Sequence, residues 1–500
     1  MIIQHIGEVL SSIDFWFFFA LVAGCTAGYI FGALPGFTAT MGVALFVPFS
    51  YGMSTSTALA FLIALYCSAV YAGSIPAILI RTPGTPAAVA TTYDGYAMAR
   101  RGEAGRALGL ACLASVLGGL LSALILCFTA EPVARLALKF GPHEYFALGI
   151  MGLSMVIGMA SDHMLKGFAA ASFGLLVTTI GMDATVGIPR FTFGNIHLLS
   201  GIGELPVMIG TFAIAEVLYG LDVSGKQVQV DQNVKGLFSG VKDILKNWWL
   251  IIKSSVIGTF LGALPGVGGP TAAMVCYNTA KQSSKNPELM GTGQPEGIIG
   301  PESANNAVTG GALIPMLALG IPGDSVTAIL LGALMIKGIQ PGPELFTKHP
   351  EVALSVYITI ILAYLVILAL ASVSIKTFAK MLKVPQPVLF GLVLICCMVG
   401  VYAVQNSYFD MILALVFGVI GYFMRRHGLD LGPFILAYVL GTMIEKKLGI
   451  AMQISHNNYL SFFTRPISGI LLGVTIVFVA ISVIKLKKKN TGKQNSTERQ

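Results

Sequence analysis

Charged side chains are scarce in this sequence. Asp, Glu, Lys and Arg together make up 11% of its 500 residues, while hydrophobic residues make up 55% and the mean hydropathy is +0.79. Because soluble domains carry about 25% charged residues, the composition excludes a soluble globular protein and predicts a chain that lies in lipid. The net charge of +8 does not indicate a nucleic-acid partner. Its densest basic cluster, at 485–489, directly follows the last apolar run and is typical of a cytoplasmic anchor.

The sequence also lacks the motifs of common enzymes and metal sites. None of its seven cysteines belongs to a Cys-x-x-Cys or Cys/His pattern, which predicts buried, reduced thiols. There is no glycine-rich loop ending in Lys-Ser or Lys-Thr, no His-Glu-x-x-His and no Gly-x-Ser-x-Gly. We therefore expect no enzyme activity, no bound metal and no cofactor other than a coupling Na⁺ or H⁺.

What the sequence does contain is a repeat. Gly-Ala-Leu-Pro-Gly occurs at 32–36 and again at 262–266, 230 positions later. Each copy ends an apolar run with a small residue at every fourth position, which lets another helix approach closely before Pro-Gly ends the helix. A second pair of breaks, Pro83-Gly84 and Pro322-Gly323, recurs at an offset of 239. Helices interrupted at corresponding places in two halves are typical of secondary transporters.

The repeat sets the predicted organisation. The segments are a first half at 1–221, a polar and basic linker at 222–246, a second half at 247–450, an added C-terminal span at 451–484 and a cytoplasmic tail at 485–500. Since a crossing needs about 20 apolar residues, we expect an all-α polytopic membrane protein with about 11 to 13 membrane segments, some of them half-length or re-entrant. A polar stretch at 281–302 has no counterpart in the first half, so we expect a loop there.

Basic residues indicate how the halves are oriented. In the first half they mark the loop at 100–106, whereas in the second half they mark the later loops at 376–383 and 425–426. Because cytoplasmic loops carry the excess of Lys and Arg, this shift by one span predicts two inverted repeats and a C-terminus in the cytoplasm.

Polar groups beside the four breaks form the candidate site. A broken helix leaves N–H groups that attract anions and carbonyl groups that coordinate cations. The predicted substrate-binding residues are Thr38, Tyr71, Gly73, Ser74, Arg81, Thr85, Gly268, Asn305, Asn306 and Ser325. The predicted cation-binding residues are Gly36, Gly84, Gly266, Glu302, Gly323 and Asp324.

Structural roles compete with these functional ones. The polar segment 302–306 opens an apolar run and either binds ligand or caps a helix. Arg81 either meets a substrate carboxylate, pairs with Asp94 or extends toward the membrane surface. Asp324 either holds a cation or proton, or caps a turn.

These motifs resemble those of the large membrane subunit of the tripartite tricarboxylate transporter family. Besides both copies of Gly-Ala-Leu-Pro-Gly, the resemblance rests on segments 71–75, 83–86, 94–96, 101–107, 301–306, 320–323 and 332–334, and it covers essentially the whole chain. It implies a multi-pass permease of the bacterial inner membrane that uses a Na⁺ or H⁺ gradient to take up carboxylates such as citrate. Its partners would be a small membrane subunit and a periplasmic solute-binding protein.

The resemblance leaves several points open. Arg81-Thr82 stands where the family pattern leads us to expect Asn-Ile, which bears on the choice of substrate. Analogy of fold favours an elevator-type movement, and a homodimer is compatible with it. Two other functions fit the same sequence: a stand-alone carboxylate symporter without a binding protein, and a membrane scaffold subunit without its own substrate path.

Overall fold

The computed structural model describes residues 14–34, 36–159, 164–183, 186–223, 237–381 and 386–497. Within these residues the regular secondary structure is helical except for a small hairpin, in which β1 (Gly181–Met182) pairs antiparallel with β2 (Pro189–Arg190). The helices group into two units that each draw on two separate stretches of chain. Unit 1 comprises Met1–Leu138 and Leu205–Tyr422, and unit 2 comprises Lys139–Glu204 and Phe423–Gln500.

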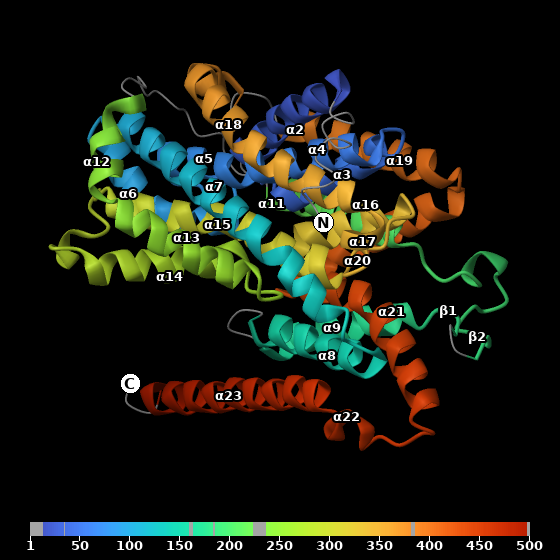
Figure 1. Ribbon diagram of the computed structural model, residues 1–500. Helices are drawn as coiled ribbons and strands as arrows, with labels where there is room; N and C mark the ends of the chain where they lie inside the picture. The colour runs from blue at the N-terminus through green and yellow to red at the C-terminus, as the bar shows by residue number, and fades with distance from the viewer. Residues whose placement is uncertain are drawn as a thin grey trace. The chain divides into compact units, whose positions relative to one another are not determined.

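Unit 1 holds all of the predicted breaks, and most of its helices are labelled in Figure 1. Its first stretch contains α2 (Phe15–Ala33), α3 (Ala39–Ser50), α4 (Thr55–Ala72), α5 (Ser74–Ile80), the 3-10 turn η2 (Pro86–Ala88), α6 (Val89–Arg100) and α7 (Ala104–Ala137). Its second stretch begins with α10 (Glu204–Met208), the π-helical η4 (Ile209–Ile214), α11 (Ala215–Val223), the 3-10 turn η5 (Leu237–Gly240) and α12 (Val241–Lys246). It continues with α13 (Trp248–Gly262), α14 (Gly268–Ser283), η6 (Pro287–Leu289), α15 (Glu296–Leu319), α16 (Ser325–Ile336), α17 (Leu345–Lys348), α18 (Pro350–Met381), α19 (Gln386–Gln405) and α20 (Tyr408–Arg426).

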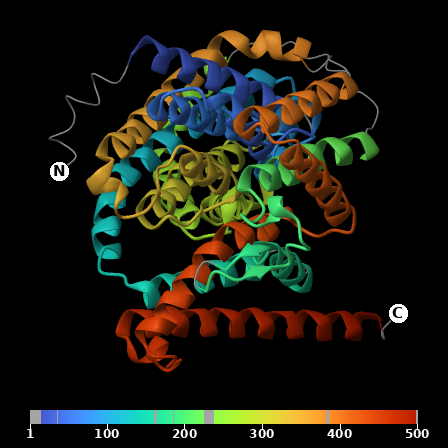
Figure 2. The same cartoon turned by 90° about the vertical axis from the view of Figure 1, so that its right-hand side faces the viewer.

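Unit 2 is built around helix α21 (Leu431–Ile454), which comes from the C-terminal part of the chain. Its other elements are α8 (Pro142–Met159), α9 (Met164–Thr178), the hairpin, the 3-10 turn η3 (Ile196–Leu198), α22 (Ser461–Thr464) and α23 (Pro466–Thr497). Helix α21 packs against α8 and α9. Arg190 of the hairpin forms ion pairs with Asp183 at 3.1 Å and with Glu445 of α21 at 2.5 Å, which ties the hairpin to that helix. Figure 2 shows α23 as one continuous helix.

The helices include enough apolar length to cross a membrane many times. In the described part of the chain, seven stretches qualify by length and composition: Phe15–Ala33, Thr55–Ile80, Ala104–Ala137, Glu204–Asp222, Pro350–Val373, Pro387–Val404 and Tyr408–Arg426. Shorter apolar helices occur as well, and two of them, α3 and α16, begin directly after a predicted break. The predicted all-α polytopic membrane fold is confirmed, while the number of crossings and the inversion of the halves stay predictions.

One face of α19 shows the surface that a membrane requires. Val388, Leu392, Ile395 and Val399 follow one another at intervals of four and three residues, and all four side chains are exposed. That spacing places them on a single side of the helix. An apolar stripe of this length is unfavourable in water but costs nothing against lipid chains.

The two copies of the small-residue ridge pack in the same way. Helix α2 lies on α4, and a Cβ atom at Gly28 would overlap the backbone carbonyl of Leu65. Helix α13 lies on α15, and a Cβ atom at Gly258 would overlap the carbonyl of Ala304. The glycines are 230 positions apart and their partners 239 positions apart. The helix contacts therefore recur at the same two offsets, 230 and 239 positions, as the sequence motifs.

The predicted loop at 281–302 was wrong at both ends. Helix α14 continues to Ser283 and α15 begins at Glu296, so the irregular segment is shorter. The residues that favour a loop are small because of packing: a Cβ atom at Gly297 would collide with the carboxylate of Asp94, and one at Gly300 would lie 3.0 Å from the carbonyl oxygen of Cys276. Close helix packing thus outweighs the weak helix propensity of glycine.

Candidate functional site at the helix breaks

Each half brings its own two breaks together. In the first half, the N–H of Gly84 donates to the carbonyl of Gly73 at 3.1 Å, and a Cβ atom at Gly84 would overlap the carbonyl oxygen of Gly32. In the second half, the N–H of Gly266 donates to the carbonyl of Gly323 at 2.8 Å, and a Cβ atom at Gly323 would lie 2.7 Å from the oxygen of Gly262. Pro35 in the first break lies outside the described residues.

The second break of each half has the same backbone conformation. Arg81 and Gly320 both take the left-handed conformation, with φ of 59° and 69°. In the first half the N–H of the next residue, Thr82, donates to the carbonyl of Pro76 at 3.3 Å. In the second half the N–H of the equivalent residue, Ile321, donates to the carbonyl of Pro315 at 3.2 Å. The first half thus carries a large cationic residue where the second has glycine, the residue that takes this conformation without strain.

The surroundings of Arg81 exclude one of its predicted partners. Its side chain is exposed, and the guanidinium carbon lies 5.8 Å from the centre of the Tyr96 ring. Asp94 is fully buried and accepts other hydrogen bonds, so the predicted pairing of Arg81 with Asp94 is wrong. A cation beside a break and facing an aromatic ring keeps its charge available to an anion.

Asp94 instead holds the segment that precedes α15. Its carboxylate accepts hydrogen bonds from the Tyr277 hydroxyl at 2.9 Å and from the N–H groups of Gly291, Gly293 and Gln294 at 2.7–3.0 Å. Arg101 adds a 2.7 Å bond to the carbonyl of Gly293. Four donors on one buried carboxylate make this a structural anchor between α6 and the inserted segment.

Asp324 has the capping role that was one of its predicted alternatives. It is the N-cap of α16, accepting the N–H of Thr327 at 2.8 Å while the Thr327 hydroxyl accepts the Asp324 N–H at 2.9 Å. Its other carboxylate oxygen accepts the hydroxyl of Tyr66 on α4 at 2.5 Å. Tyr66 did not stand out from the sequence, although it lies 239 positions before Asn305 and the repeat offset points to it.

Thr85 follows the other Pro-Gly pair but makes no such cap. It precedes η2 with φ of −126° and ψ of 153°, as an N-cap residue does, yet its side chain accepts no N–H group of the turn. Its hydroxyl is buried and has no hydrogen-bond partner within the described residues. The same is true of the Asn305 side-chain nitrogen, the Asn306 side-chain oxygen and the Ser303 hydroxyl.

Glu302 lies at the centre of a buried polar cluster. The segment 302–306 lies within α15 and every residue of it is buried, so the helix-capping alternative is wrong. The Thr91 hydroxyl of α6 donates to one oxygen of Glu302, and the Ser115 hydroxyl of α7 donates to the other at 3.0 Å. The carboxamide of Asn306 donates to Ser115 at 2.8 Å. Thr91 and Ser115 were not predicted, since nothing in their own segments marks them.

The remaining predicted residues lie in defined local environments. Thr38 caps α3 by accepting the N–H of Met41 at 3.1 Å, and the Ser74 hydroxyl donates to the carbonyl of Tyr71 at 2.8 Å. Tyr71 is fully buried and meets Tyr29 edge to face. Positive φ angles of 86°, 82° and 61° occur at Gly36, Gly266 and Gly268. Ser325 begins α16 and is half-buried.

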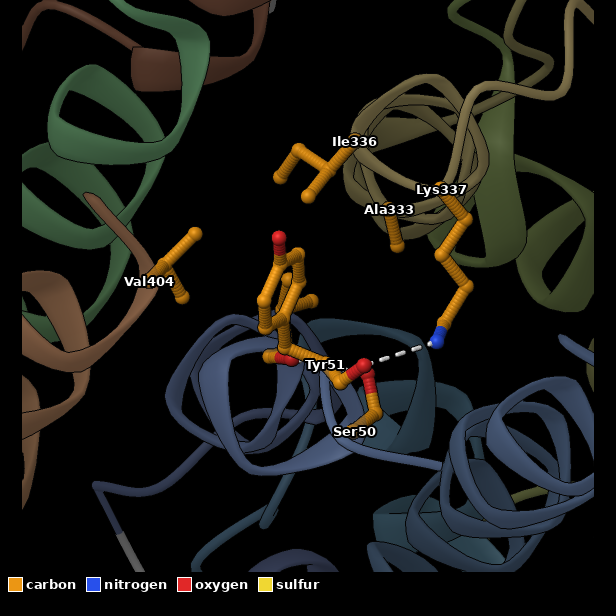
Figure 3. Close-up of a pocket in the computed structure, with 7 residues that line it drawn as sticks. Ser50, Tyr51, Ala333, Ile336, Lys337 and Val404 are labelled. Carbon is orange, nitrogen blue, oxygen red and sulfur yellow. Dashed lines mark hydrogen bonds between the residues drawn. The ribbon is translucent and has the colours of Figure 1, made fainter. Parts of the chain in front are cut away.

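A shallow indentation lies away from these residues, between the ends of α3, α16 and α19. Figure 3 shows its lining, which includes Tyr51, Ile336 and Val404. Lys337 closes one side by donating to the carbonyls of Tyr51 at 3.1 Å and Met53 at 2.7 Å. Burial lowers the pKa of this lysine. Within the described residues, no group of three or more His, Cys, Asp or Glu is placed to hold a metal ion.

Duplicated helix breaks in a polytopic helical fold, with buried polar groups beside them, define a membrane transport protein. The chain belongs to the tripartite tricarboxylate transporter TctA family, whose profile matches residues 18–436. It is therefore the membrane component of a system that also includes a small membrane subunit and a periplasmic binding protein. The predicted family is confirmed.

Two relatives from Agrobacterium vitis are similar to this chain. One, an uncharacterized 52.8 kDa protein in the TAR-I ttuC' 3' region, is 37% identical over 462 residues, which is 92% of each chain. The other, an uncharacterized protein in the TAR-II ttuC' 3' region, is 37% identical over 227 residues, covering 45% of this chain and 94% of its own length. No solved structure matches the chain.

Proposed function

We propose that this chain takes up an organic di- or tricarboxylate across the bacterial inner membrane, coupled to the entry of Na⁺ or H⁺. It works with a small membrane subunit and with a periplasmic solute-binding protein that delivers the substrate. The observation that carries the proposal is the pair of matched breaks, packed alike in both halves, with buried polar atoms near them that have no hydrogen-bond partner among the described residues. Membership of the TctA family supports it.

Two of the unpartnered groups favour an anion. The hydroxyl of Thr85 and the side-chain nitrogen of Asn305 are hydrogen-bond donors, and both are buried. A buried donor without a partner costs about 1–3 kcal/mol, which a bound carboxylate would recover. Arg81 supplies a positive charge at the edge of the same break.

Glu302 is the group best suited to the coupling cation. It is fully buried, its two oxygens face only the hydroxyls of Thr91 and Ser115, and no cationic side chain pairs with it in the described part of the chain. An isolated buried carboxylate is strongly disfavoured unless a cation or proton neutralises it. Oxygen ligands of this kind suit Na⁺ or a proton. Asp324 is the weaker candidate, because capping and Tyr66 already occupy its oxygens.

Binding of the cation and binding of the substrate are then expected to be coupled. Moving a polyanion through a region of low dielectric constant is costly, and a cation bound nearby offsets part of its charge. We infer that both bind near the membrane centre, between two inverted halves, with the C-terminus in the cytoplasm. An elevator-type movement of part of unit 1 and a homodimer fit this arrangement. Reporter fusions after residue 500 and in the 284–295 segment test the orientation.

Uptake into proteoliposomes tests the function. The chain is reconstituted with its small membrane subunit, and radiolabelled citrate, succinate or lactate is added with the binding protein under an imposed Na⁺ or pH gradient. We expect concentrative uptake of a di- or tricarboxylate that stops when the gradient is collapsed. Full uptake without the binding protein would support a stand-alone symporter, and no gradient-dependent uptake of any carboxylate would support a scaffold.

A further inference from the structure

The repeat offset relates two pairs of residues across the halves. A shift of 239 positions takes Thr85 to Asp324 and Tyr66 to Asn305. Asp324 of the second half accepts a hydrogen bond from Tyr66 of the first half. Exchange of the halves therefore predicts that Thr85 of the first half faces Asn305 of the second.

The packing of the surrounding elements agrees with this exchange. Helix α16, which Asp324 caps, packs against α3, and η2, which follows Thr85, packs against α14. A point at the Cβ position of Gly269 lies 2.6 Å from the Asn305 side-chain oxygen and 3.1 Å from the Cβ atom of Ala87 in η2. The carboxamide of Asn305 thus lies beside the turn that Thr85 precedes.

The two pairs differ in their hydrogen bonds. At Asp324 the carboxylate is bonded on both oxygens, to Thr327 and to Tyr66. Thr85 is 7% exposed and Asn305 is 3% exposed, yet the Thr85 hydroxyl and the Asn305 nitrogen have no partner among the residues described. Two such donors, related by the repeat to a hydrogen-bonded pair and lying beside one turn, are suited to a ligand that accepts hydrogen bonds.

We propose that Thr85 and Asn305 bind one carboxylate group of the substrate. Tyr66 and Asp324 are the equivalent pair in the other copy of the repeat, where the two side chains bond directly to each other instead of to a ligand. The Thr85 hydroxyl donates to one carboxylate oxygen and the Asn305 nitrogen to the other. Both residues are neutral donors, which suits an anion, whereas the carboxylate of Asp324 repels one. One copy of the repeat binds the substrate and the other joins the halves. This assignment rests on the proposed function.

Direct binding measurements test the assignment. The purified wild-type chain in lipid nanodiscs is titrated with citrate and with succinate in NaCl by calorimetry. The carboxylate that binds the wild type is then the probe for every variant. Thr85→Val and Asn305→Asp keep the size of the side chain and remove the donated bonds, so each is expected to weaken binding about tenfold or more. Thr85→Ser keeps the hydroxyl and is expected to bind within about threefold of wild type.

Thr359 provides a matched control. It is a fully buried threonine of α18 whose hydroxyl also has no partner in the described residues, so Thr359→Val makes the same chemical change elsewhere. We expect its affinity for the probe to match the wild type. Each variant is first checked for an unchanged melting temperature without ligand, and Asn305→Asp carries the test if Thr85→Val is unstable.

The outcomes separate this inference from the proposed function. Wild-type protein that neither binds nor transports any carboxylate would overturn the function itself. Wild-type binding that persists unchanged in both Thr85→Val and Asn305→Asp would leave the function standing and remove these residues from the site. Equal weakening by Thr359→Val would show a general effect on stability and would overturn the assignment as well.

Discussion

The hydroxyl of Tyr66 donates a 2.5 Å hydrogen bond to Asp324, joining a helix of the first half to the start of α16 in the second. The bond is buried on the side of Tyr66, which is 2% exposed. A hydrogen bond to a charged group contributes about 1.5–3 kcal/mol. This contact is therefore expected to contribute more to joining the two repeat halves than a typical surface ion pair does.

Loss of that bond is expected to destabilise the protein without affecting substrate binding. Tyr66→Phe removes only the hydroxyl, leaves Asp324 with one hydrogen bond fewer and is expected to cost about 2 kcal/mol. Thermal unfolding followed by intrinsic fluorescence measures the change. Tyr438→Phe, which removes a hydroxyl bonded to the carbonyl of Ile202 in unit 2, is the control for losing a neutral hydrogen bond and should cost less. An unchanged melting temperature for Tyr66→Phe contradicts the role.

The glycine ridges are expected to tolerate no methyl group. Gly28→Ala and Gly258→Ala place a Cβ atom against the carbonyls of Leu65 and Ala304, and each is expected to cost about 1–3 kcal/mol or more through overpacking. The two losses should be similar, because the contacts are equivalent. Gly391→Ala in α19, where nothing lies within 4 Å of the new atom, is the control and should be neutral or stabilising. Melting curves of the detergent-solubilised variants decide between these outcomes.

Arg81 is expected to destabilise the fold through its backbone conformation and to favour substrate binding through its charge. An L-residue in the left-handed conformation costs about 1–2 kcal/mol, so Arg81→Gly should raise the melting temperature whereas Arg81→Ala should not. Both variants remove the cation beside the break and should raise the KM for carboxylate uptake, while Arg81→Lys should preserve much of the affinity. If uptake is identical in all four proteins, the charge of Arg81 has no part in binding.

The anchor at Asp94 is expected to control the shape of the segment before α15. Asp94→Asn keeps the size of the side chain but turns an amide NH₂ group toward donors such as the N–H of Gly291. The segment should detach, and trypsin should cut after the exposed Lys285 about tenfold faster or more. Glu288→Gln changes an exposed carboxylate of the same segment and should leave the cleavage rate unchanged. Equal rates for wild type and Asp94→Asn contradict the anchoring role.

The breaks were predictable from the sequence, whereas the polar cluster around them was not. Pro-Gly pairs and small residues at every fourth position act locally, so their positions and both offsets carry over to the structure. The start of α15 was misplaced because Gly297 and Gly300 favour a loop, although close packing is what requires them. Thr91 and Ser115 meet Glu302 only through the packing of three helices, which no single segment encodes.

Replacement of Glu302 is expected to separate transport from coupling. Glu302→Gln keeps the size of the side chain and can still bond to the hydroxyls of Thr91 and Ser115, which rotate to suit it. The variant cannot take up a proton and is a poorer ligand for Na⁺. In proteoliposomes it should therefore exchange internal for external citrate at equilibrium while failing to concentrate citrate under an imposed Na⁺ or pH gradient.

The control for this variant lies on the same helix. Glu296 is a half-buried carboxylate in the first turn of α15, and Glu296→Gln should leave concentrative uptake unchanged. Exchange and gradient-driven uptake measured on one batch of vesicles distinguish a coupling defect from poor reconstitution, because poor reconstitution lowers both. If Glu302→Gln concentrates citrate as the wild type does, the coupling cation binds elsewhere, and Asp324 is then the next carboxylate to replace, since it directly follows a break.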